Sequence, residues 1–68
     1  MKLSARNVLK GTVVEVTKGA VNTIVRIDIG GAVVSSSITI SAVDELGLKV
    51  GEQAYAVIKA SDVMVGRD

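Results

Sequence analysis

Cysteine and histidine are both absent from this chain of 68 residues. Without them the chain can form no disulfide bond and lacks the common ligands for zinc, iron and copper. The most frequent catalytic base and the thiol nucleophile are also missing, so we do not expect an enzyme. A domain this small buries only about 60% of the surface of its unfolded chain, and oligomerisation is the remaining way to enlarge its core. The composition therefore predicts an oligomer.

Aromatic rings and excess charge are scarce too. There is no Phe or Trp, the one Tyr is Tyr55, and the formal net charge is +1. Proteins that bind single-stranded nucleic acid stack bases on aromatic rings beside a basic groove. Tyr55 is expected in the core of an apolar strand, so we expect no nucleic-acid partner. No apolar run approaches the roughly 20 residues of a membrane span and no signal-peptide core follows Met1, which predicts a cytoplasmic protein without a membrane partner.

Carboxylates are spread along the chain, apart from the adjacent Asp44 and Glu45. No calcium-loop spacing is present, so we expect no metal cation.

The chain is instead rich in branched residues, with 13 valines and 6 isoleucines, which favour β-structure. Strands are expected over 7–16, 20–29, 32–40, 53–59 and 63–65. In the second of these, one face carries the alternate residues Val21, Thr23, Val25, Ile27 and Ile29. Gly30 and Gly31 supply the positive φ of a tight hairpin, and Gly11 marks a bulge or a close approach.

A short helix is expected where this period of two ends, over 41–47. Ser41 is the predicted N-cap, Asp44 and Glu45 lie in the predicted first turn, and Gly47 ends the helix. The 53–59 strand is apolar on both faces, so a partner subunit is expected to cover one of them. Three strands, one short helix and two strands predict a single all-β domain over 1–68, a five-stranded Greek-key barrel of the OB type.

Two segments hold hydrogen-bond donors without acceptor-only side chains. In an extended chain the side chains of Ser4 and Arg6 project from the same side. Lys59 and Ser61 show the same pattern, a cationic side chain and a hydroxyl two residues apart. Such groups, together with main-chain amides, suit a small dianion. The plainer interpretation is that Arg6 and Lys59 are ordinary surface cations, Asn7 a turn residue and Ser61 a cap. The candidate site comprises Ser4, Ala5, Arg6, Asn7, Lys59, Ala60 and Ser61.

A second candidate is the turn formed by Lys18, Gly19, Ala20 and Val21. Gly19 can expose consecutive amides in a concave nest that holds an anion, and several copies around a symmetry axis could share one ion. The alternative is that this segment is only a turn.

Four stretches of the sequence together resemble the molbindins, small bacterial proteins made of one Mop domain. They are SARNVLKG at 4–11, VVEVTKGAV at 13–21, ITISAVDELGLKVGE at 38–52 and AVIKASDVMV at 56–65. The same domain occurs in molybdate-responsive regulators and in some molybdate transporter ATPases. The resemblance covers nearly the whole chain, in order and without large gaps.

This resemblance implies an OB-like barrel that assembles as a homo-hexamer, a trimer of dimers, and binds molybdate or tungstate between subunits without a cofactor. Ser4, Arg6 and Asn7 match the family's S-A-R-N element, and 59–61 match the K-[AS]-[ST] element that completes the site, expected from a neighbouring subunit. The 18–21 turn matches a second class of site near a symmetry axis. Ser37 and Thr39 could approach the first site, although they also fit plain sheet surface.

The function implied is intracellular molybdenum storage and homeostasis. The alternative is a detached oxyanion-sensing or regulatory module that partners a transporter or a transcription regulator. Against it, the sequence has no helix-turn-helix and no nucleotide-binding glycine loop.

Overall fold

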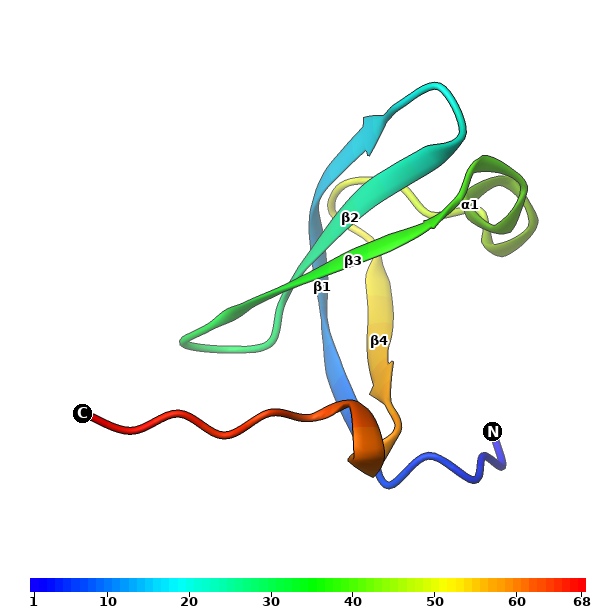
Figure 1. Ribbon diagram of the computed structural model, residues 1–68. Coiled ribbons are helices and arrows are strands. Elements are labelled where there is room, and N and C mark those ends of the chain that lie inside the picture. Colours follow the sequence, from blue (N-terminus) through cyan, green and yellow to red (C-terminus); the bar gives the residue numbers. More distant parts are fainter.

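The computed structural model describes all residues from 1 to 68. One antiparallel sheet forms most of the molecule, with a short α-helix at one end (Figure 1). The elements are β1 (Asn7–Lys18), β2 (Asn22–Asp28), β3 (Val33–Thr39), α1 (Ile40–Leu46), β4 (Gln53–Ile58) and a 3-10 helix, η1 (Ala60–Asp62). No helix is long and apolar enough to cross a membrane.

The long strand β1 joins the two halves of the sheet, whose strand order is β3-β2-β1-β4. Its first half pairs with β4, from Asn7↔Ile58 to Thr12↔Gln53, and its second half pairs with β2. The β1–β2 register shifts between Val13 and Glu15. A β-bulge increases the local twist and bends its strand. β1 therefore curves from one partner to the other, and the sheet becomes a half-barrel whose edge strands are β3 and β4.

Gly11 lies where β1 crosses from β4 to β2. A Cβ at this position would overlap the carbonyl oxygen of Asp28 and lie 2.7 Å from Cγ2 of Ile27. The close approach predicted at Gly11 is therefore confirmed, while the bulge itself lies a few residues later. The hairpin predicted at Gly30 and Gly31 is also present, with φ of 89° and 91°.

The core is small and follows the predicted alternation along β2. Thr23, Val25 and Ile27 are all buried, and α1 packs Val43 against this face of the sheet. Only six of the 68 residues are buried, whereas fifteen large apolar side chains are exposed. Tyr55 is one of them, at 44% exposure, so its predicted place in the core was wrong. It lies on β4 between Ala54 and Ala56, and consecutive strand residues face opposite sides.

The helix start and its N-cap lie two residues earlier than predicted, with Ile40 as the first helical residue. Its N-cap is Thr39, whose Oγ1 accepts a hydrogen bond of 3.1 Å from the amide of Ala42, so the prediction of Ser41 as the cap was wrong. Thr39 ends β3 in an extended conformation, which is the backbone geometry that an N-cap needs. As a result no acid lies in the first turn. The predicted ending is confirmed, because Gly47 has φ 62° and ψ 36°.

The fifth strand, predicted over 63–65, is not formed, so a single chain has four strands rather than five. After β4 the chain reverses through η1, and residues 63–68 are exposed and extend away from the sheet (Figure 1). A strand requires hydrogen bonds to a neighbouring strand, and 63–65 pairs with no strand of this chain. The all-β class with one short helix is confirmed, while the closed five-stranded barrel is not formed by one chain.

Candidate functional site

The two segments of the first candidate site meet at one end of the sheet. Asn7 is the first residue of β1 and pairs with Ile58, the last residue of β4. In an antiparallel pair, the residues before one strand and after the other leave from the same end. Residues 4–6 and 59–61 therefore lie close together in one chain, as Figure 1 shows for the start of β1 and for the turn after β4. A contribution from a neighbouring subunit is not needed to bring them together.

The donors at this end are free in the single chain. The molecule has two ion pairs, and neither includes Arg6 or Lys59. Both side chains are exposed, as are the hydroxyls of Ser4 and Ser61. Lys59 is the N-cap residue of η1, but its side chain makes no capping hydrogen bond. The amides of 4–6 and 59–61 donate no hydrogen bond within the chain. The site therefore offers two cations, two hydroxyls and several unused main-chain donors.

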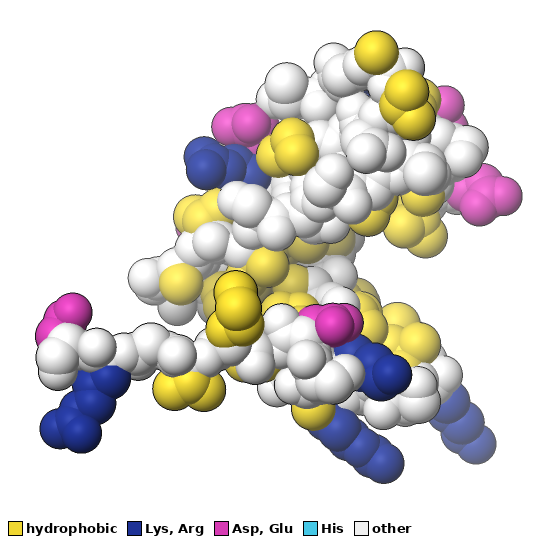
Figure 2. All heavy atoms as spheres, viewed as in Figure 1, with side chains coloured by type: hydrophobic (Ala, Val, Ile, Leu, Met, Phe, Trp, Pro, Cys, Tyr) yellow, Lys and Arg dark blue, Asp and Glu magenta, His cyan; other side chains and the backbone are white.

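The local charge at this end is positive. Four basic side chains and one acidic side chain lie in segments 1–11 and 57–62. The basic residues are Lys2, Arg6, Lys10 and Lys59, and the acidic residue is Asp62. Figure 2 shows Lys and Arg side chains projecting from the lower part of the molecule, where both chain termini lie. The whole chain has a net charge of only +1, so the basic residues are unevenly distributed. A concentration of positive charge at an exposed end raises the local concentration of anions.

The side chain of Asn7 has a hydrogen-bond partner within the chain, which the sequence did not predict. Its Nδ2 donates a hydrogen bond of 3.1 Å to the carbonyl oxygen of Ile58, and the residue is half-buried. This bond ties the start of β1 to the end of β4. Asn7 is therefore a positioning residue, because it holds Arg6 and Lys59 at the same end of the sheet. Ala5, also half-buried, offers only its backbone.

The second candidate, the turn at 18–21, does not form the predicted nest. Gly19 lacks the positive φ of such a nest, and its amide donates a 2.8 Å hydrogen bond to the carbonyl of Asn22. The charge of Lys18 is partly offset by Asp44, whose Oδ1 lies 3.6 Å from Nζ in an exposed ion pair. The amides of Ala20 and Val21 remain without partners. The turn thus has two free amides, but its amides do not form the concave array of donors that a nest requires.

Ser37 and Thr39 lie far from the first site. Thr39 pairs with Asn22, at the start of β2, and Ser37 pairs with Ile24. That end of the sheet carries the 18–21 turn, and β1 separates it from Asn7 by its full length. Within one chain Ser37 and Thr39 therefore do not approach the first site, and both are exposed on the sheet surface, as the alternative interpretation expects.

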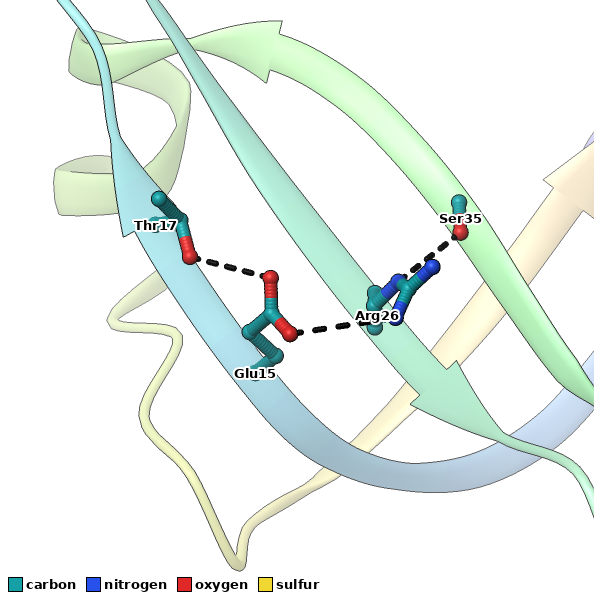
Figure 3. Close-up of polar contacts among 4 residues, drawn as sticks. All are labelled: Glu15, Thr17, Arg26 and Ser35. Carbon is teal, nitrogen blue, oxygen red and sulfur yellow. Dashed lines mark hydrogen bonds and ion pairs between the residues drawn. The ribbon is translucent and has the colours of Figure 1, made fainter.

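Sequence reasoning missed a chain of polar contacts across three strands. Figure 3 shows Glu15 between Thr17 and Arg26: Thr17 Oγ1 donates to Glu15 Oε2 at 3.0 Å, and Arg26 Nη1 lies 3.9 Å from Glu15 Oε1. Arg26 Nε also donates to Ser35 Oγ at 3.2 Å. Arg26 and Ser35 are register partners nine residues apart, which the hairpin prediction could have revealed. Because Arg26 is already paired with a carboxylate, it is a poorer anion ligand than Arg6.

The comparison with known proteins decides the family. The family model of the TOBE domain matches residues 3–65, nearly the whole chain. The chain belongs to the TOBE-domain family. A probable molybdenum-pterin-binding protein of Haemophilus influenzae is 61% identical over 67 residues, which are 97% of each protein. The resemblance found in the sequence motifs is therefore confirmed.

Two solved structures share this TOBE fold. A molybdate-binding protein from Sporomusa ovata matches with a TM-score of 0.92 and 37% identity, over 98% of this chain and all of that one. The cytoplasmic molybdate-binding protein ModG, solved with molybdate bound, matches with a TM-score of 0.88 and 51% identity. That match covers 94% of this chain and 46% of ModG. The matched TOBE segment of this chain includes both parts of the first candidate site.

Proposed function

We propose that this TOBE domain binds molybdate or tungstate at the end of the sheet where 4–7 and 59–61 meet. The observation that carries the proposal is the meeting of two cations and two hydroxyls, all without partners in the chain, at the Asn7–Ile58 pair. The molybdate-binding relatives support the choice of ion. Binding leaves the ion chemically unchanged, and no cofactor takes part.

Charge and geometry explain how such a site would hold its ion. A tetrahedral dianion carries two negative charges, which Arg6 and Lys59 match in number. Hydrogen bonds in which one partner is ionised are about twice as strong as neutral ones, and the planar guanidinium of Arg6 can donate two at once. Ser4, Ser61 and the free amides complete the shell from other directions. Asn7 keeps the two segments in register.

The assembly we propose is a homo-hexamer, a trimer of dimers, with the ions held between subunits. Its support is the apolar surface of the single chain, where fifteen large apolar side chains are exposed around six buried residues. Monomers rarely leave so much apolar surface in contact with water. In the cytoplasm such an assembly would store molybdenum and buffer its concentration. A second role, as a sensing module within a larger transporter or regulator, is favoured instead if pull-downs consistently recover such a protein.

Ligand-dependent stability tests the proposal. An ion that binds only the folded assembly stabilises it by mass action. We expect sodium molybdate to raise the melting temperature, and sodium chloride at equal ionic strength to leave it unchanged. Native mass spectrometry with and without molybdate then counts subunits and bound ions together. The absence of any thermal shift at saturating molybdate and tungstate would contradict the proposed function.

Two substitutions locate the site. Arg6→Ala and Lys59→Ala each remove a charge-assisted donor, which is worth about 1.5–3 kcal/mol, or roughly ten- to a hundredfold in the molybdate Kd. Lys49→Ala is the matched control, because Lys49 is also exposed, forms no ion pair and lies in the turn before β4, outside the candidate site. Titration calorimetry should show similar losses for the first two variants and none for the control. Normal binding by Arg6→Ala would mean that the ion binds elsewhere.

A further inference from the structure

The charged side chains divide the molecule into a positive part and a negative part. Segments 1–11 and 57–62, which meet at the candidate site, carry four basic side chains and one acidic side chain, a formal charge of +3. The remaining residues carry four basic and six acidic side chains, a formal charge of −2. In Figure 2 Lys and Arg side chains project from the lower part, and acidic side chains flank the upper part. Both ion pairs lie outside the two segments, so no carboxylate partner neutralises the cations at the site.

Two of these cations, Lys2 and Lys10, lie beside the site without belonging to it. Lys2 precedes Ser4 by two residues, which is about 7 Å of extended chain. Lys10 follows Asn7 by three residues of β1, which is about 10 Å along the strand. Both side chains are exposed, and neither forms an ion pair. At such separations a charge still acts on a dianion in the site through the solvent.

The single acid at this end, Asp62, lies closer still. It directly follows Ser61, and its amide donates a hydrogen bond of 2.9 Å to the carbonyl of Lys59 within η1. Its side chain is exposed and forms no ion pair with Lys59 or with any other cation. A free carboxylate in this position repels a dianion and attracts the Lys59 ammonium, which is one of the proposed ligands. The chain therefore places one opposing charge next to its own anion site.

We propose that Lys2, Lys10 and Asp62 set how tightly the site holds its dianion, although none of them contacts it. Lys2 and Lys10 strengthen binding by long-range attraction, and Asp62 weakens binding by repulsion. Charges at the rim of a site act on the association rate and on the salt dependence of binding. The carboxylate keeps the affinity below the value that the cations alone would give, which lets a store release its ion. The inference rests on the proposed function and names the residues that regulate the affinity of that site.

Coulomb's law gives the size of each contribution. A unit charge about 10 Å from a dianion in water changes the dissociation constant about fourfold when no salt is present. Salt reduces this effect, because the Debye length is about 20 Å at an ionic strength of roughly 20 mM and about 3 Å at 1 M. We therefore expect each charge to change the molybdate Kd by about two- to threefold at low ionic strength and by almost nothing at high ionic strength.

Variants that remove one charge test the proposal through the sign of their effects. At an ionic strength of about 20 mM, titration calorimetry should show a higher molybdate Kd for Lys2→Gln and Lys10→Gln and a lower Kd for Asp62→Asn. Lys49→Gln and Glu45→Gln are the matched controls, because both residues are exposed, form no ion pair and lie outside the site. The two controls should bind molybdate with the Kd of the parent.

A double variant and a salt series separate the effect of charge from an effect on structure. Lys10→Gln combined with Asp62→Asn restores the local charge, so its Kd should return to the value of the parent. In about 1 M sodium chloride, each single variant should bind molybdate like the parent. Arg6→Ala should still bind more weakly there, because it lacks hydrogen bonds to the ion, whose loss does not depend on screening.

The inference and the proposed function fail in different ways. A parent protein that binds no molybdate contradicts the proposed function and the inference that rests on it. A parent that binds molybdate, together with an Asp62→Asn variant that binds equally or more weakly, overturns the inference alone. The inference is also overturned if the weaker binding of Lys2→Gln or Lys10→Gln persists in about 1 M salt, since that result would show direct contact with the ion.

Discussion

Replacing Thr23 with valine should stabilise this protein, although it removes a polar group. Thr23 is completely buried on the inner face of β2, and its Oγ1 has no hydrogen-bond partner. A buried polar atom without a partner costs about 1–3 kcal/mol relative to an apolar group of the same shape. Valine places a methyl group where the hydroxyl stands and keeps the branched shape that suits a strand. We therefore expect Thr23→Val to raise the free energy of unfolding by about 1–3 kcal/mol.

That gain is large for a domain of 68 residues, whose total stability should be roughly 3–10 kcal/mol. Each 1 kcal/mol shifts the melting temperature of such a domain by about 4–8 °C. Urea unfolding followed by far-ultraviolet circular dichroism measures the change, at one fixed protein concentration because assembly contributes to stability.

Two further variants make the measurement decisive. Thr12→Val changes an exposed threonine of β1 and should stay within about 0.5 kcal/mol of the parent. Thr23→Ser keeps the hydroxyl and removes a buried methyl group, so it should destabilise the fold. A loss of stability in Thr23→Val, together with tolerance of Thr23→Ser, would refute the reasoning, because it would mean that the hydroxyl of Thr23 donates to a partner.

Three other substitutions have expected outcomes in the same unfolding and binding assays. Gly11→Ala should cost about 1–3 kcal/mol, because the added Cβ meets the backbone of β2, which no side-chain rotation can relieve; a neutral result would contradict the close crossing. Thr39→Ala should cost about 0.5–2 kcal/mol as the loss of an N-cap, and Ser41→Ala should cost less, with the reverse order refuting the assignment of the cap. Asn7→Ala should weaken molybdate binding by about 0.5–1.5 kcal/mol through loss of its bond to the β4 carbonyl, with urea unfolding and calorimetry separating this from global destabilisation.

Only part of the candidate site could be predicted from the pattern of residues in the sequence. Alternation in an extended chain was enough to group Ser4 with Arg6 and Lys59 with Ser61. It was not enough to find that Asn7 donates to the carbonyl of Ile58, because those residues are 51 positions apart. Amide side chains serve turns, caps and ligands alike, and their partners follow from which strands become neighbours. The same reason explains Arg26, whose partners Glu15 and Ser35 come from two other strands.

Local steric and conformational rules determined much of this protein from the sequence alone. Branched residues at every second position made β2 a strand with one buried face, and Gly47 ended the helix because glycine adopts positive φ without strain. The absence of cysteine and histidine excluded disulfides and common metal sites. Only the tertiary structure decided that Thr39 rather than Ser41 caps α1, that Tyr55 is exposed, and that 63–65 has no partner strand. Each of those outcomes depends on which distant backbone groups come within hydrogen-bonding or packing distance. A local pattern of residues does not determine which groups become neighbours.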